Sequence, residues 1–226
     1  MDRDETPIGG LEKPLAPTRQ LFHVSIGMDV LAVLLSLFIS WFFFAGIVIY
    51  ILLSRAYSYR GIRLKQFPLI GFLTVFLCQG ALIFFITYEA CSTDHSLPAP
   101  LSLLIASLLI GALYPLTQIY QHEADLADGV QTISCRLGKR GTFIFSAIQF
   151  LFANVAFYFL SRQQGRLNQW WLFLVMLLPV VLFFLYWMSK VWRDGSAADF
   201  RHSLRMNILS TTCTTAFFMT LNLMNH

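Results

Sequence analysis

An apolar run over residues 101–120 ends in a short acidic segment. The oxygen-bearing side chains of this segment belong to Gln121, Glu123, Asp125 and Asp128. Gln121 and Asp125 are four positions apart, so a helix that continued through the segment would place them on one face. Mg²⁺ prefers a few carboxylates together with water and substrate phosphate oxygens. The segment is therefore a candidate magnesium site, although a charged helix end is more often only a solvated rim.

A second acidic cluster lies in the opening segment MDRDETPIGGLEKP. If both clusters face one cavity, they could hold metal ions that in turn hold a diphosphate. The metal ligands predicted from the two clusters are Asp2, Asp4, Gln121, Glu123 and Asp125.

The basic segment YSYRGIRLK could contact the phosphate oxygens. Arg63 and Lys65 could contact these oxygens as charge-assisted hydrogen-bond donors. Tyr57 and Tyr59 are assigned to substrate binding with these two cations. The positive-inside rule explains the cations without any ligand, and an aromatic belt would explain the tyrosines.

The elements that must position these residues cross a membrane. Each of five uncharged windows is long enough to span about 30 Å of hydrocarbon as a helix. The apolar stretch 21–57 predicts two more helices, roughly 21–39 and 41–57, that meet near Ser40. We therefore predict an all-α polytopic membrane protein of about seven transmembrane helices, with 1–226 as one membrane domain. The five windows are 68–88, 101–120, 142–160, 170–188 and 208–225.

Composition agrees with this fold class. Of the 226 residues, 57% are hydrophobic and 12% charged, and a soluble domain usually carries about twice that share of charge. The formal charge of +4 comes without a basic folded face, which argues against a nucleic-acid partner. The four cysteines form no CxxC pair, and the polar first 20 residues do not resemble a signal peptide.

Basic residues predict the orientation. Fourteen of the sixteen Lys and Arg residues fall in one set of segments if Arg55 is counted with them. The positive-inside rule places this set in the cytoplasm, with the N-terminus and the remnant acidic cluster of residues 1–20. We expect the bacterial inner membrane. The cytoplasmic segments are 1–20, 58–67, 121–141 and 189–207.

The string YQHEADLADGVQTISCRLG resembles the second acidic motif of the UbiA-type prenyltransferase superfamily. In that motif a DxxxD pair is followed four residues later by a glycine and then by a Thr/Ser-rich segment that ends in LG. The loop YSYRGIRLKQFPLIG looks like the tyrosine-and-basic loop of the family, and DRDETPIGGLEKP is similar to the tail of its first motif, NDxxDxxxD. The positions in register with the second motif are Asp125, Gly129, Thr132, Leu137 and Gly138.

The chain departs from the family pattern at several points. Gln121 replaces the first Asp of DxxxD and offers a neutral carbonyl without a charge. Thr6 replaces the last Asp of the first motif, with Asp4 only two residues away. The family fold has nine helices, and this chain resembles the last seven. We therefore expect an N-terminally shortened or divergent member, through a misassigned start codon or a real truncation, with little activity of its own.

The resemblance implies transfer of a polyprenyl group from its diphosphate to a lipophilic or aromatic acceptor, with Mg²⁺ as cofactor. The metal would neutralise the leaving diphosphate, and Arg63 and Lys65 would share that charge. The alternative is a non-catalytic paralogue that serves as a membrane scaffold or binding protein, which Gln121 and Thr6 favour. A transporter is the weaker third interpretation, because the sequence has no inverted repeat.

Four further polar residues have competing interpretations. Asp29 lies in an apolar span and should face a partner, a cavity or the nearby membrane surface. Asn207 matches an amide-rich position of the family and is assigned to substrate binding, with a helix cap as the equal alternative. His122 and His202 are expected to be solvated histidines near the cytoplasmic face.

Overall fold

The computed structural model describes residues 18–92 and 96–225, and within them every regular element is helical. Short 3₁₀ turns at Leu64–Gln66 (η1) and Gly195–Ala197 (η3) and a π-helix at Phe76–Leu82 (η2) connect the longer helices. The α-helices are α1 Arg19–Ser36, α2 Trp41–Ser58, α3 Pro68–Val75, α4 Ile83–Cys91, α5 Pro100–Gln118, α6 His122–Ala127, α7 Ile133–Gln163, α8 Leu167–Arg193 and α9 Phe200–Asn225.

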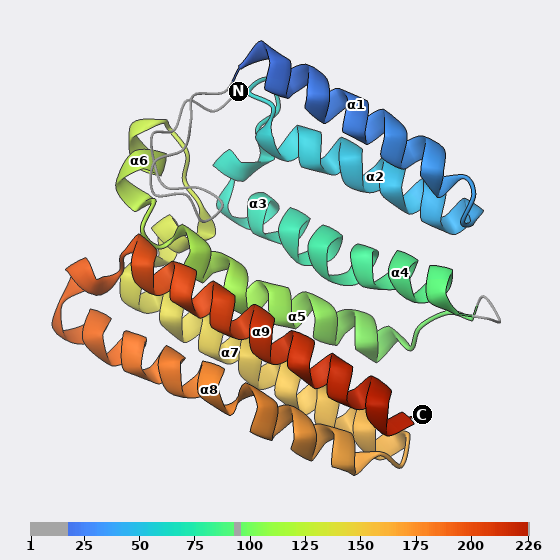
Figure 1. The fold of residues 1–226 in the computed structure, drawn as a ribbon. Coiled ribbons are helices and arrows are strands. Elements are labelled where there is room, and N and C mark those ends of the chain that lie inside the picture. Colours follow the sequence, from blue (N-terminus) through green and yellow to red (C-terminus); the bar gives the residue numbers. More distant parts are fainter. Residues whose placement is uncertain (1–17, 93–95, 226) are drawn as a thin grey trace.

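The predicted fold class is confirmed. In the described part of the chain, six helices are long and apolar enough to cross a membrane: α1, α2, the continuous α3–η2–α4 rod, α5, α7 and α8. The seventh predicted span, 208–225, falls within α9, which has 26 residues and runs beside the others (Figure 1). Its many Thr and Asn side chains make α9 less apolar than the other long helices.

Local signals explain where several helices begin. Ser40 caps α2 by accepting a hydrogen bond of 3.0 Å from the Phe43 amide, so the stretch 21–57 folds as two helices that meet at this residue, as predicted. Thr132 caps α7 in the same way through the Cys135 amide. α7 begins nine residues before the predicted window because two helices merge across a kink at Gly138, whose φ is +67°.

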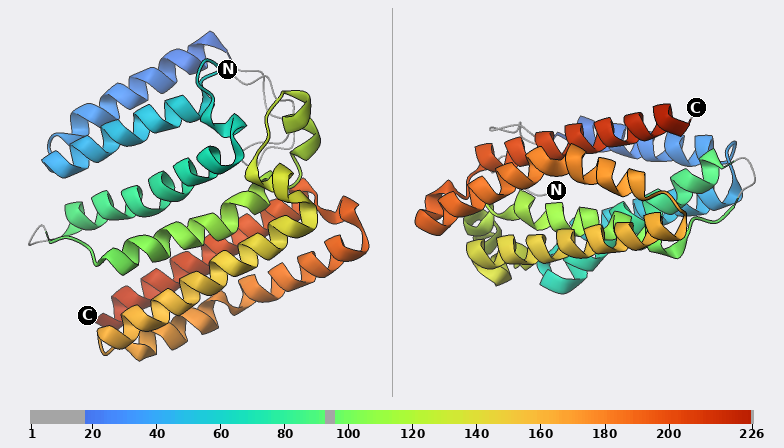
Figure 2. Two further views of the ribbon diagram at one scale, coloured as in Figure 1. Left: turned by 180° about the vertical axis from the view of Figure 1, so that it is seen from behind. Right: turned by 90° about the horizontal axis from the view of Figure 1, so that it is seen from below.

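The helices form two groups. α1, α2 and the α3–α4 rod follow one another in a row beside α5, and α7, α8 and α9 pack on the other side of α5 (Figures 1 and 2). The buried core lies in the second group, where Phe143 and Trp187 are fully buried with ring centroids 4.9 Å apart. Where the rod meets α5 the backbones are very close, since a Cβ on Gly80 would stand 2.3 Å from the Ser107 Cα. Small residues permit such approach between membrane helices.

Polar contacts at both ends of α2 hold it against its neighbours. Arg55 of α2 binds the Asp29 carboxylate of α1 and donates a hydrogen bond of 2.9 Å to the Ser25 hydroxyl. Asp29 is thus a contact between helices, which was one of the alternatives that the sequence left open. At the opposite end of α2, the Ser40 hydroxyl donates to the buried Glu89 carboxylate at 2.6 Å, which links α2 to α4.

Candidate functional site

The candidate site lies at the end of the bundle that carries α6. The α2–α3 connection and the α5–α7 connection meet there (Figure 1). The first contributes the basic segment with η1, and the second contributes the acidic segment with α6. The structure therefore brings together the two segments that the sequence assigned to one site.

Arg63 and Asp128 join the two connections. The Arg63 guanidinium binds the Asp128 carboxylate and also donates to the Asp128 carbonyl oxygen at 3.2 Å. Arg63 is 8% exposed, and its backbone is left-handed with φ of 45°. A residue without glycine's freedom keeps this conformation only where its surroundings hold it. Here the two bonds to Asp128 provide such restraint.

The charge around Asp128 is strongly positive. The hydrogen bond from Arg63 lowers the pKa of the Asp128 carboxyl below its ordinary value, and the charges of Arg63, Arg60 and Lys65 add to this effect against the opposing effect of burial. Arg60 is more distant, with 3.7 Å between its guanidinium and the carboxylate. Three cations thus surround one carboxylate at this end of the bundle.

A chain of hydrogen bonds connects α2 to α5 beside this cluster. The hydroxyls of Tyr57 and Tyr114 are hydrogen-bonded to each other, and the Gln118 side-chain amide donates to Tyr114 at 2.8 Å. An amide NH₂ can only donate, so Tyr114 accepts from Gln118 and its own proton can go to Tyr57. The sequence indicated Tyr57, but it gave no reason to single out Tyr114 or Gln118.

Asp125 is the buried acid of α6. Its side chain is 5% exposed, and its backbone is fixed by hydrogen bonds to Gln121 on one side and Val130 on the other, both 2.8 Å. Burial raises the pKa of the nearby Tyr120, a hydrogen bond from Gln121 lowers it, and the charge of Asp125 raises it to a smaller extent. Because it is the buried acid of α6, Asp125 is the ligand candidate that we take from this helix.

The other predicted metal ligands do not all gather around Asp125. Glu123 is exposed although it lies in the same short helix, and Asp2 and Asp4 lie outside the described residues. Among the residues that are described, no three His, Cys, Asp or Glu side chains form a group that could hold a metal. Mg²⁺ needs only one or two protein carboxylates when substrate phosphates complete its shell. Asp125 supplies one such carboxylate.

His122 has a structural role that the sequence did not predict. Its Nε2 lies 2.8 Å from the Ser134 hydroxyl, which is 3.0 Å from the Thr142 hydroxyl, and Thr142 donates to the Gly138 carbonyl. Burial lowers the His122 pKa, and the charge of Lys139 lowers it further. The expectation of a solvated histidine is wrong, because this chain of bonds fastens α6 to the start of α7.

The remaining predicted residues lie at varied depths. Tyr59 is 66% exposed, whereas Lys65 is half-buried. Asn207 is exposed on α9, and its carbonyl accepts a hydrogen bond from Ser210. His202 is half-buried and bonded to Asp199 at 2.8 Å, so it is not a solvated histidine either.

Comparison with known protein families supports the resemblance found in the motifs. The model of the UbiA prenyltransferase family matches residues 6–211. This chain belongs to that family. Neither the curated proteins nor the solved structures gave a match. The match begins at Thr6, just after the opening acidic residues, and ends in α9, so both connections of the candidate site lie within the family region. The chain is a multi-pass membrane protein of prenyltransferase type.

Proposed function

We propose that this UbiA family member transfers a polyprenyl group from its diphosphate to a lipophilic or aromatic acceptor in a Mg²⁺-dependent reaction. The observation that supports this best is the pairing of a buried acid, Asp125, with a cluster of cations at the same end of a membrane bundle. A diphosphate needs both, since cations neutralise its charge and a carboxylate can hold the metal that bridges its oxygens.

Asp125 is the residue proposed to hold the metal, with the neutral Gln121 carbonyl as a second ligand. Asp2 and Asp4 remain predicted ligands from the first acidic cluster, and Glu123 from α6. When bound, Mg²⁺ would act as a Lewis acid that stabilises the leaving diphosphate. Because Gln121 carries no charge, Asp125 would supply most of the negative charge that α6 gives to the metal.

Arg63 and Lys65 are proposed to bind the diphosphate oxygens. Arg63 is held in a fixed orientation by Asp128, and a planar guanidinium matches the geometry of phosphate oxygens. Tyr57 is hydrogen-bonded to Tyr114, which accepts from Gln118, and a tyrosine hydroxyl is a group that can contact an oxygen of the substrate. Tyr59 and Asn207 are proposed as further substrate contacts.

The experiment that tests this function uses the full chain in detergent or nanodiscs. Binding of a short prenyl diphosphate is measured with Mg²⁺ and with EDTA, and transfer to aromatic acceptors is measured in the same preparation. We expect saturable binding that needs Mg²⁺ and product that appears only when an acceptor is present. Equal binding in EDTA would refute the role of the metal.

A second candidate function is that of a non-catalytic family member that binds prenyl diphosphate or serves as a membrane scaffold. Gln121 in place of an acid favours it. Binding without transfer would support this candidate. If Gln121→Asp then produced transfer, the missing charge would be the cause.

The orientation in the membrane is also proposed. The α6 end should face the bacterial cytoplasm, and the α4–α5 connection should face outward. Cys91 is exposed at the end of α4, so an impermeant maleimide should label it from outside in intact cells. Asp128→Cys, placed at the α6 end in a variant without Cys91, should react only after lysis. External labelling at position 128 would contradict both the topology and the location of the site.

A further inference from the structure

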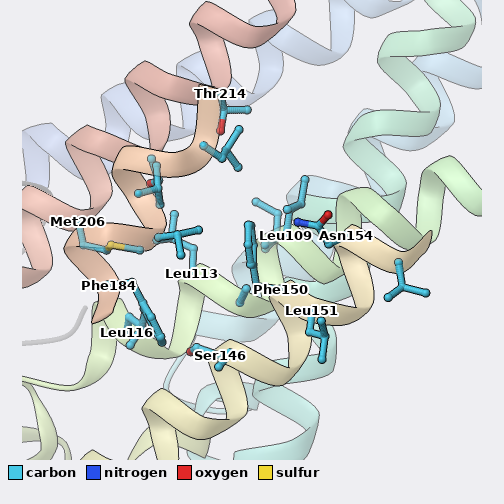
Figure 3. Close-up of a pocket in the computed structure, with 18 of the residues that line it drawn as sticks. Leu109, Leu113, Leu116, Ser146, Phe150, Leu151, Asn154, Phe184, Met206 and Thr214 are labelled. Atoms are coloured by element: carbon cyan, nitrogen blue, oxygen red, sulfur yellow. The ribbon is translucent and has the colours of Figure 1, made fainter. Parts of the chain in front are cut away.

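A large cavity lies within the second group of helices, away from the charged cluster. Its volume is about 870 Å³, and α5, α7, α8 and α9 all line it (Figure 3). On α5 the lining comes from a set of residues that includes Leu109, Leu113 and Leu116, whereas Tyr114 and Gln118 of the charged end are not part of it. The cavity is therefore a separate space.

The cavity extends from the protein core to the lipid-facing surface. Some of its lining residues are almost fully buried, such as Leu116 at 2% exposure, while others are open, such as Leu151 of α7 at 61%. Exposed lining residues on α7 and α8 face the bilayer, since both helices are candidate spans. A molecule dissolved in the membrane can therefore reach the cavity without passing through water.

The chemistry of the lining excludes a charged occupant. The described residues that line the cavity include no Asp, Glu, Lys, Arg or His. A diphosphate placed there would lose its hydration and gain no cation, which is very unfavourable. The occupant that fits must be uncharged and mostly apolar.

Neutral hydrogen-bond donors are nevertheless present in the wall. The Ser146 hydroxyl is buried and makes no hydrogen bond with any described residue, although most buried hydroxyls do. Two turns further along α7, the Asn154 carbonyl oxygen accepts from the Trp170 indole at 3.1 Å, which leaves the Asn154 NH₂ as a donor. These groups match a ligand that carries acceptor oxygens.

From these observations we infer that the cavity between α5, α7, α8 and α9 is a binding site for a neutral membrane lipid that carries a carbonyl oxygen. The carbonyl would accept the proton of Ser146, and the apolar body would fill the space along α7 toward Asn154. A volume of 870 Å³ corresponds to roughly 30 water-sized units, enough for a ring or glycerol ester with a chain. The inference goes beyond the proposed transfer reaction and does not depend on it.

The test measures binding of two probes to the purified full chain by native mass spectrometry. One probe is a benzoquinone with a decyl chain, and the other is dioleoylglycerol, so the two arms distinguish a quinone from a neutral glycerolipid. We expect at least one probe to bind saturably with one molecule per chain. Absence of saturable binding by both would overturn the inference.

Matched variants locate the site. Ser146→Ala should weaken probe binding about three- to tenfold, as expected for one lost hydrogen bond. Ser161→Ala should have no effect, because Ser161 is equally buried and equally without a described partner in the same helix but does not line the cavity. Equal effects of the two changes would overturn the role of Ser146.

Filling the cavity gives an independent readout if the hydroxyl matters little. Leu113→Trp should occupy the space and reduce probe binding at least about tenfold, whereas Leu52→Trp on the lipid-facing side of α2 should not. Asp125→Ala should leave probe binding unchanged, so failure of this inference and failure of the proposed transferase function give different results. Unchanged binding in Leu113→Trp would refute the location.

Discussion

The α6 end of the bundle and the cavity between α5, α7, α8 and α9 both contain deeply buried polar groups. Those groups are charged at the α6 end and neutral in the cavity. At the α6 end, Arg63 and Asp125 are 8% and 5% exposed, and Arg63 is bonded to Asp128. In the cavity, Ser146 is 1% exposed and has no described hydrogen-bond partner. The first region is ionic and the second is neutral.

The difference follows from the free energy of burial, which is much less favourable for an ion than for a neutral hydroxyl. An ion taken out of water needs a partner of opposite charge, whereas an unpaired hydroxyl costs only about 1–3 kcal/mol. Charges therefore accumulate only where opposite charges or a ligand can meet them, as at the α6 end. A single unpaired hydroxyl can be tolerated in the cavity until a ligand arrives. The two regions should thus bind chemically different molecules.

The largest expected effect is at Asp125. Asp125→Ala should abolish Mg²⁺-dependent binding of a prenyl diphosphate, because Gln121 cannot replace its charge. Gln121→Asp should retain or strengthen binding. Titration calorimetry with a short prenyl diphosphate, at fixed Mg²⁺, measures both. Normal binding by Asp125→Ala would show that the metal role assigned to this residue is wrong.

Arg63 should show the next largest effect. Removal of one partner from a buried ion pair costs about 3–5 kcal/mol, and the side chain of Asp128 is partly exposed, so we expect the lower end of that range for Arg63→Ala. Arg60→Ala is the matched control, since the Arg60 side chain is 50% exposed at 3.7 Å from the same carboxylate, and surface pairs contribute about 0–1 kcal/mol.

For this comparison, the unfolding free energy of each variant is measured in denaturant, and its affinity for the diphosphate is measured separately. Arg63→Ala should lose both stability and affinity, while Arg60→Ala should lose little stability. Neither change should alter binding of a neutral probe in the cavity. Equal destabilisation by the two substitutions would mean that burial of the Arg63–Asp128 pair has no energetic importance.

Much of the fold could be predicted because membrane helices depend on local sequence. The sequence alone shows the uncharged windows and the turn at Ser40. It also shows the prolines at which α3 and α5 begin, Pro68 and Pro100. The kink at Gly138 was not predicted. A left-handed glycine inside a helical pattern leaves no mark on hydropathy, so the start of α7 was misplaced.

The site could be predicted only in part, for a different reason. The ionic residues were visible because charges stand out in an apolar sequence. Their pairing was not visible, since Arg63 and Asp128 are 65 positions apart. The cavity left no signal at all, because Ser146 and Asn154 resemble ordinary small polar residues of a membrane helix. Only packing of four helices reveals that they line one space.

The smallest effect concerns pH and His122. Burial and Lys139 lower the His122 pKa in the folded protein, so the unfolded chain binds a proton more readily. Stability from this group is complete above the unfolded pKa of about 6.5 and is lost as pH falls through the lower folded pKa. Asp128 also has a lowered pKa, but its contribution is lost only below the unfolded value of about 3.9. Between pH 7.5 and 5, His122 should therefore contribute more than Asp128 to the change in the free energy of unfolding.

His122→Gln tests this assignment. At pH 7.5 the variant should lose about 1 kcal/mol, the usual value of one hydrogen bond, here that to Ser134. Its unfolding free energy should then fall less between pH 7.5 and 5 than that of the parent chain. His23→Gln, on the exposed surface of α1, is the matched control. A pH slope that His122→Gln leaves unchanged would mean that another group senses pH, and that the bond between α6 and α7 does not couple the charged end to protonation.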